Sequence, residues 1–167
     1  MKQVLGSLLV LSLLGGCASD VPLVIREPLA DNPSLADVQH NPKAFVKRRV
    51  RWGGRIVHTK SVANKTEVEI LAIALGADGR PEPGDASLGR FIADSGAFLD
   101  RAIYSANRDV TVYGVLENVL MRNIGEHPYT YPLVQAVQIY LWPEWRDYGN
   151  AAWYPQFNFG FGVGGGF

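Results

Sequence analysis

Five short segments between residues 49 and 142 alternate apolar and polar residues in the way that is typical of β-strands. In the second segment, Glu67 and Glu69 face the side opposite to Val68 and Ile70. Gly, Pro, Asn and Asp residues, which favour turns, separate the segments. We therefore expect a mainly β chain with strands at 49–58, 66–75, 89–94, 109–118 with an extension toward 124, and 130–142.

A short helix is expected between the third and fourth strands. Residues 98–107 are compatible with a helix that Asp100 caps and Asn107 ends. Five strands with a helix in this place have the order of an OB-fold, a small and partly open Greek-key barrel. Gly53 and Gly54 in the first strand suit the tight coiling of such a barrel. We therefore predict a five-stranded OB-like barrel, with a β-sandwich as the alternative.

The N-terminus has the features of a secretory signal peptide. Lys2 supplies its positive charge, and residues 4–14 are mostly apolar but fall short of the ~20 residues that a permanent membrane helix needs. The stretch ends at Leu14-Gly15-Gly16-Cys17, which resembles the lipobox of bacterial lipoproteins. The thiol is the side chain there that is nucleophilic enough to accept a diacylglyceryl group. We expect residues 1–16 to be removed and the lipid to be attached at Cys17.

Cys17 is the single cysteine of the chain, so no intramolecular disulfide forms although export leads to an oxidising compartment. An N-acyl group and an S-diacylglycerol on Cys17 are the non-protein groups that we expect, and no cofactor is predicted. Two or more acyl chains make membrane attachment stable. Ala18 stands where an aspartate, in the enterobacterial sorting pattern, retains a lipoprotein in the inner membrane. We therefore expect the outer membrane, on its periplasmic side, with surface exposure as the alternative.

Removal of residues 1–16 leaves 151 residues, the size of one domain. Lys2 is the charged residue that is lost, so 15 basic side chains face 16 acidic ones, and this balance argues against nucleic acid as a partner. Residues 17–33 contain several prolines and are predicted to be an extended tether. Residues 34–146 form the predicted OB-like domain, which begins with a short helix capped by Ser34. Residues 147–167 are rich in Gly and aromatic residues and are predicted to be a flexible tail, or a segment that docks on membrane, glycan or protein.

No cluster of residues in the sequence predicts catalysis or metal binding. His40, His58 and His127 fall in separate segments without the spacing of a metal site. The serines lack the Gly-x-Ser-x-Gly pattern of a serine hydrolase. Glu67 and Glu69 share a strand face and form a candidate acid–base pair, although a solvated strand face is the more common outcome.

Arg51, Arg55 and Arg90 are candidates for a binding face. In an OB barrel, basic residues beside an aromatic residue such as Trp52 can form a platform for an oligosaccharide or an oligonucleotide. Export and the near-neutral charge disfavour a nucleic acid. The alternative, which we prefer, is structural: each arginine pairs with a carboxylate of Glu67, Glu69, Asp94 or Asp100, and Trp52 belongs to the core.

Several short strings follow one another in a specific order. They are the lipobox, Arg51-Trp52-Gly53-Gly54, Thr66-Glu67-Val68-Glu69, Gly79-Arg80-Pro81, Gly89-Arg90-Phe91, Phe98-Leu99-Asp100 and Tyr140-Leu141-Trp142-Pro143. In this order they resemble the Slp (starvation-inducible) family of outer-membrane lipoproteins, over about residues 10–143. Arg101 departs from the proline that we expect there in the family. The resemblance implies an outer-membrane lipoprotein of stationary phase or stress and implies no catalytic activity.

These features together predict a non-enzymatic lipoprotein that is anchored in the outer membrane and binds an envelope protein or an envelope glycan. A carrier for a small ligand in the mouth of the barrel is the first alternative. An envelope hydrolase is the second alternative, and it requires a convergent acid–base pair in a cleft.

Overall fold

Five strands dominate the fold in a computed structural model that describes residues 20–144. The strands are β1 (Arg49–Val62), β2 (Lys65–Ile73), β3 (Gly89–Asp94), β4 (Asp109–Ile124) and β5 (His127–Leu141). Short helices precede them: α2 (Leu23–Arg26), α3 (Leu35–His40) and the 3-10 turn η2 (Pro42–Ala44). All five predicted strands are present, and the predicted extension of the fourth strand toward residue 124 is confirmed. β1 continues past the predicted residue 58 to Val62, and β5 begins at His127, before the predicted residue 130.

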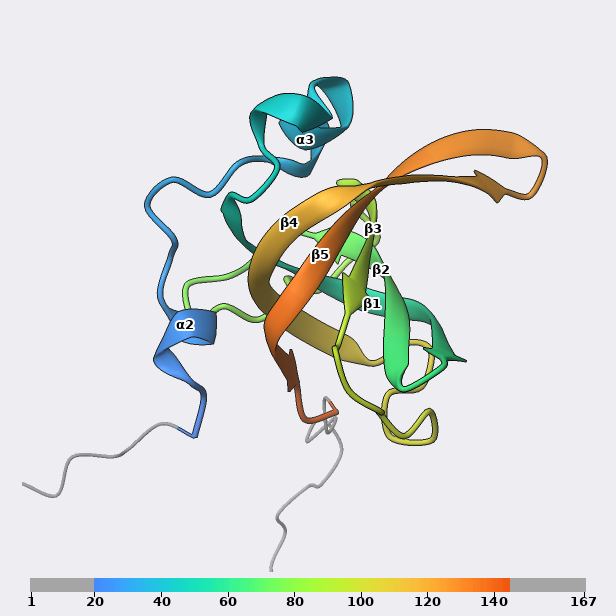
Figure 1. The fold of residues 1–167 in the computed structure, drawn as a ribbon. Helices are drawn as coiled ribbons and strands as arrows, with labels where there is room; N and C mark the ends of the chain where they lie inside the picture. Colours follow the sequence, from blue (N-terminus) through green and yellow to red (C-terminus); the bar gives the residue numbers. More distant parts are fainter. Residues whose placement is uncertain (1–19, 145–167) are drawn as a thin grey trace, which may run out of the picture.

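The strands close into a barrel in the order β1, β2, β3, β5, β4, with β4 returning to β1 (Figure 1). Neighbouring strands are antiparallel except β3 and β5, which pair in parallel. This ring confirms the prediction of a mainly β, OB-like barrel of five strands. Because residues 20–144 form one ring and no second sheet, the alternative of a β-sandwich is wrong.

The interior of the barrel is filled by large apolar side chains that alternate along the strands. Trp52 from β1 and Phe91 from β3 meet edge to face, with ring centroids 5.4 Å apart. Fully buried aliphatic side chains surround them: Val50, Ile56, Val68, Ile70, Val110, Val112, Leu116 and Val134. Gly54 lets β2 approach β1 closely, since a Cβ there would lie 1.9 Å from the carbonyl oxygen of Leu71.

The two ends of the barrel are covered by different segments. α3 covers one end, where Ser34 caps it as predicted and where Leu35 and Val38 join the core. The connection between β3 and β4 lies at the other end and packs Leu99 and Tyr104 against the core (Figure 1).

The helix predicted at residues 98–107 is absent, and this prediction is wrong. One hydrogen-bonded turn forms, from the Tyr104 N–H to the Asp100 carbonyl oxygen, and it is not continued. The next groups bond to the barrel instead: the Tyr104 carbonyl accepts from the Thr59 hydroxyl at 2.6 Å, and the Asn107 N–H donates to the Ile56 carbonyl. Contacts to β1 therefore replace the hydrogen bonds that a helix would make.

The β4–β5 hairpin extends well beyond the barrel (Figure 1). The two strands stay paired from Val110 and Leu141 to Ile124 and His127. Gly125, with φ of 59°, makes the tight turn at the tip. Figure 1 shows this arm projecting on the side of β2 and β3, away from α2.

Candidate functional site

The segment before the barrel is fastened to β1 by the side chain of Arg51. Its Nε donates to the carbonyl oxygen of Ile25 at 2.6 Å, and its Nη2 donates to that of Arg26 at 3.2 Å. The Ile25 side chain is fully buried. The sequence predicts an extended tether at residues 17–33, but from α2 onward the segment packs against the barrel. We name residues 21–33 the N-terminal clamp.

Asn32 completes the clamp at the edge of β1. Pairing with β2 stops at Gly53, opposite Ile73, so the peptide groups of Arg51 lack a β2 partner on that side. The Asn32 side-chain amide donates to the Arg51 carbonyl oxygen and accepts from the Arg51 N–H, both at 2.8 Å. One side chain thus replaces a missing strand residue at this edge.

Arg51 is engaged by the protein itself. Only 6% of its surface is exposed, and its partners are carbonyl oxygens. Burial lowers the pKa of Arg51 from its ordinary value, and the charge of Asp78 acts in the opposite direction. In this position Arg51 holds α2 and the following residues of the clamp against β1.

Trp52 points into the barrel, where 7% of its surface is exposed. Its indole Nε1–H donates to the carbonyl oxygen of Pro33 at 2.9 Å, which ties the end of the clamp to the core. Trp52 and Arg51 therefore face opposite sides of β1.

Arg55 lies near Asp109 of β4, with 3.7 Å between its Nε and the carboxylate oxygen. Arg80, from the loop after β2, approaches the same carboxylate at 3.9 Å and stacks over Trp142 at 5.6 Å. The Trp142 Nε1–H donates to the Thr111 hydroxyl at 2.9 Å. This loop thereby covers the outer face of β1 and β4.

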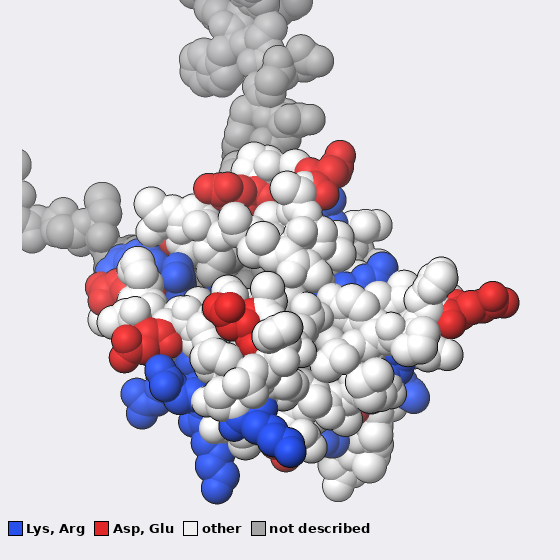
Figure 2. All heavy atoms as spheres, turned by 90° about the horizontal axis from the view of Figure 1, so that it is seen from above, with Lys and Arg blue, Asp and Glu red and all other residues white. Residues whose placement is uncertain are grey.

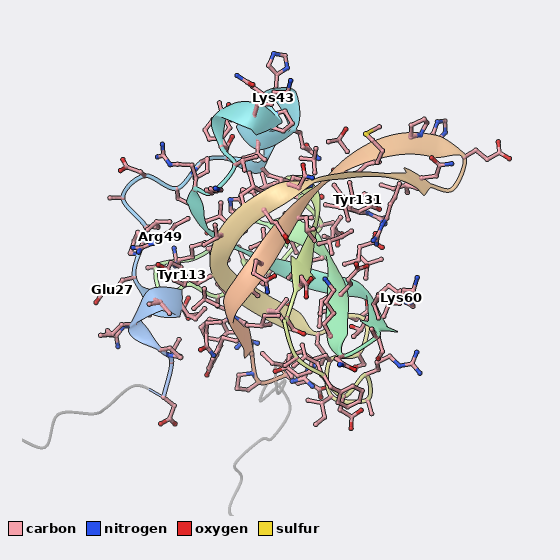
Figure 3. All side chains as sticks on the ribbon, in the orientation of Figure 1. Glu27, Lys43, Arg49, Lys60, Tyr113 and Tyr131 are labelled. Atoms are coloured by element: carbon pink, nitrogen blue, oxygen red, sulfur yellow. The ribbon has the colours of Figure 1, made fainter. Side chains whose placement is uncertain are left out.

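Arg90 is part of an ionic network on the outer face of β2 and β3. It donates to the Glu69 carboxylate at 2.7 Å, and the Tyr131 hydroxyl donates to the same oxygen at 2.9 Å. Arg122, from the projecting hairpin, donates to Glu67 at 2.8 Å. Figure 3 shows Tyr131 at the base of this hairpin, near β2 and β3. The network ties the hairpin to the barrel and occupies both carboxylates that were candidates for an acid–base pair.

Hydrogen bonds and burial shift the pKa values of side chains in and beside this network. The hydrogen bond to Glu69 raises the pKa of Arg90. Burial, followed by the hydrogen bond to Glu69, raises the pKa of Tyr131. Nearby, the ammonium of Lys65 is hydrogen bonded to the buried Asp94, and this bond raises the pKa of Lys65.

The structure does not bring the four predicted binding-face residues together. Trp52 lies inside the barrel, Arg51 lies under the clamp, Arg55 lies beside Asp109, and Arg90 lies on β3. Arg90 instead pairs with Glu69, as expected from the alternative in which the arginines have a structural role. Sequence reasoning missed Asn32 and Tyr131, because their partners are distant in the chain and no local motif marks them.

A pocket of about 410 Å³ opens where the β1–β2 ladder stops, between the clamp and the end of β2. Its lining is mostly apolar and includes Leu35, Trp52, Ile73, Leu75 and Leu88. Leu88 stands at its rim with 57% of its surface exposed. We name this the gap pocket; its size suits a small apolar molecule or one or two side chains of a partner.

Within residues 20–144, no group of three or more His, Cys, Asp or Glu side chains is placed to hold a metal ion. Among these residues no helix has the length and apolar character that a membrane crossing requires. Cys17 and its lipobox, and the predicted tail at 147–167, lie outside the described residues. Their roles stay predictions.

Residues 14–163 match the outer membrane lipoprotein Slp family. The chain belongs to this family. It is 27% identical to the outer membrane protein Slp of Escherichia coli, covering 93% of this chain and 89% of that protein. It is 28% identical to the uncharacterized lipoprotein YeaY of the same species, covering 78% and 67% of the two chains.

A further relative is an uncharacterized protein of Haemophilus influenzae, 32% identical over 89% of this chain and 81% of its own length. No solved structure matches the chain significantly. The resemblance to the Slp family that the ordered strings indicate is therefore confirmed.

Proposed function

We propose that this member of the Slp family is anchored in the outer membrane through acylated Cys17, on its periplasmic side, and works there as a non-enzymatic interaction module. The observation that carries the proposal is the filled barrel, because side chains such as Trp52, Phe91 and Ile70 occupy the interior. A ligand or partner is then recognised on the outer surface. A role in stationary phase or stress is the further expectation that the family resemblance supplies.

The pairing of two carboxylates on the outer face of the barrel supports a non-enzymatic role. Glu67 and Glu69, the candidate acid–base pair, are held by Arg122 and Arg90. Each of these carboxylates is therefore engaged by an arginine of the protein itself. The partner that we propose is an envelope protein or an envelope glycan.

The anchor is tested by expressing the wild-type chain and a Cys17→Ser variant with a clickable palmitate analogue. We expect labelled, membrane-bound protein from the wild type, and unlabelled, unprocessed precursor from the variant. Labelled variant protein in the membrane would refute the role of Cys17. Cross-linking in intact cells then identifies partners, and a chain without residues 147–167 is the comparison. An unchanged set of partners would refute a role for the tail.

The gap pocket favours a second candidate function, the binding of a small apolar ligand. Ala36 and Leu88 both line it, and we expect a larger residue at position 36 to occupy part of its volume. Native mass spectrometry of protein extracted from membranes is expected to show a retained small molecule in the wild type and its loss in Ala36→Trp. Equal spectra of the two proteins would count against this candidate.

A further inference from the structure

Leu23 and Val24 form an apolar surface on α2, with 59% and 44% of their surfaces exposed. The next residue, Ile25, is fully buried and is held through its carbonyl by Arg51. One shallow hollow is lined by Leu23, Val24, Glu27, Pro28, Leu29 and Tyr113. Because Ile25 fixes the helix to the barrel, Leu23 and Val24 keep a fixed outward position.

The position of this surface in the chain limits what can face it. Leu23 lies six residues after Cys17. Six residues span at most about 20 Å, because an extended chain covers ~3.4 Å per residue. A compact domain with the number of residues from 20 to 144 has a diameter of about 35 Å. Since the barrel is wider than this spacer is long, an anchored Cys17 keeps α2 on the membrane side of the barrel.

An exposed basic cluster precedes and opens β1; Figure 3 shows its member Arg49 on the side where α2 lies and its member Lys43 beside α3. The basic cluster consists of Lys43, Lys47, Arg48 and Arg49. Within residues 20–144, no member of this basic cluster forms an ion pair. Figure 2, seen from above, shows Lys and Arg side chains gathered toward the lower left of the molecule.

Arg49 connects the basic cluster to α2. It lies on the same outward side of β1 as Arg51, two residues away, and Arg51 holds α2. Figure 3 shows Arg49, Tyr113 and Glu27 on the side of the barrel where α2 lies. Glu27 contributes a negative charge there, 3.9 Å from Arg26. Arg26 and Arg49 therefore lie with Glu27 beside the apolar surface of α2.

We propose that α2, through Leu23 and Val24, together with Arg49 and its neighbour Arg48 at the start of β1, forms a face that rests on the phospholipid bilayer holding the anchor. The apolar side chains enter the interface between headgroups and acyl chains, and the cations contact anionic headgroups. This inference rests on the proposed acylation of Cys17. It adds an orientation: the ionic network and the projecting hairpin point away from the membrane-facing surface.

The test uses the full, acylated protein in vesicles of phosphatidylethanolamine and phosphatidylglycerol. Because Cys17 is the single cysteine, its acylation leaves no thiol, and an introduced cysteine carries a fluorescent label alone. Val24→Cys reports on the proposed face. Ile103→Cys is the matched control, an apolar residue with 53% exposure in the loop between β3 and β4, away from α2 (Figure 1).

We expect brominated lipids to quench the label at position 24 at least threefold more strongly than the label at position 103. Equal quenching at the two positions would overturn the proposal. So would a label at position 24 that is shielded from water but not quenched, since this indicates a protein on that surface. Far-ultraviolet spectra and unfolding midpoints equal to wild type establish that both variants are folded.

A charge variant tests Arg48 and Arg49. In the Val24→Cys background, Arg48→Glu with Arg49→Glu is expected to halve the quenching in vesicles that contain phosphatidylglycerol and to leave it unchanged in neutral vesicles. Unchanged quenching in both would remove the two arginines from the proposed face. Mass spectrometry of the N-terminal peptide distinguishes a failure of the proposed anchor from a failure of the proposed orientation. A peptide without acyl chains refutes the proposed anchor, whereas an acylated peptide with equal quenching refutes the orientation alone.

Discussion

The side-chain amide of Asn32 bonds to both peptide groups of Arg51, with each hydrogen bond 2.8 Å long. These bonds take the place of a β2 residue where the ladder between β1 and β2 ends. The first part of the described chain is therefore attached to the barrel by both the backbone and the side chain of one arginine.

Replacing Asn32 by Ala is expected to lower the free energy of unfolding by about 2 kcal/mol, because an N–H and a carbonyl group lose their partner in a partly buried place. Urea unfolding of the mature chain measures this. Asn123→Ala is the control, since Asn123 is exposed on the projecting hairpin. Equal losses for the two variants would contradict the strand-replacing role of Asn32.

Replacing Arg51 by Met is expected to release α2 from the barrel. The carbonyl oxygens of Ile25 and Arg26 lose a charged donor, and a loss of about 1.5–3 kcal/mol corresponds to a tenfold or greater rise in local opening. The rate of trypsin cleavage after Arg26 reports this opening. Arg49→Met changes an exposed arginine on the same side of β1 and should leave the rate near that of wild type. A rate in Arg51→Met that equals the control would mean that Arg51 does not hold the clamp.

Replacing Gly54 by Ala is expected to cost about 3 kcal/mol or more, or to prevent folding, because its Cβ would meet the carbonyl oxygen of Leu71 at 1.9 Å. The backbone of β2 would have to move. Gly76→Ala is the matched control, since a Cβ there has its nearest neighbour at 3.4 Å. Thermal unfolding of both variants measures the difference. A Gly54→Ala protein with the midpoint of Gly76→Ala would show that the close approach of β1 and β2 is dispensable.

The Tyr131 hydroxyl predicts a loss of stability at alkaline pH. Burial and Glu69 raise its pKa in the folded protein. A raised pKa gives a contribution that is complete below the unfolded value of about 10 and is lost as the pH rises through the folded value. Unfolding free energies between pH 8 and 11 are expected to fall less steeply in Tyr131→Phe than in wild type. Parallel curves would contradict a coupling between Tyr131 and Glu69.

The strands were predictable because alternation is a local property of the sequence. Val68 and Ile70 opposite Glu67 and Glu69 mark β2 without knowledge of its neighbours. The order of the strands then indicates the barrel. The turn at 98–107 was mistaken for a helix because its backbone groups bond to Thr59 and Ile56, more than 40 residues away in the chain.

The candidate site was less predictable for the same reason. That Arg90 pairs with Glu69 follows from the register of β2 and β3, and the sequence suggests the partner but not the geometry. The acceptors of Arg51 are peptide carbonyls, which every residue has, so no side-chain pattern identifies them. The prolines of residues 22–33 predict an extended linker. The packing of this segment against the barrel depends on one buried residue, Ile25, which no local pattern marks.

The N-terminal clamp also determines how mechanical force enters the domain. With Cys17 anchored as proposed, tension between the membrane and the barrel reaches α2 first and passes through the Ile25 and Arg26 carbonyls to Arg51. These few bonds open before any strand of the barrel is pulled. Their opening frees residues 21 to 31, about 35 Å of extended chain at ~3.4 Å per residue, as far as the bonds of Asn32 and Pro33. Under such tension the barrel can therefore move away from the membrane by this additional length while it stays folded.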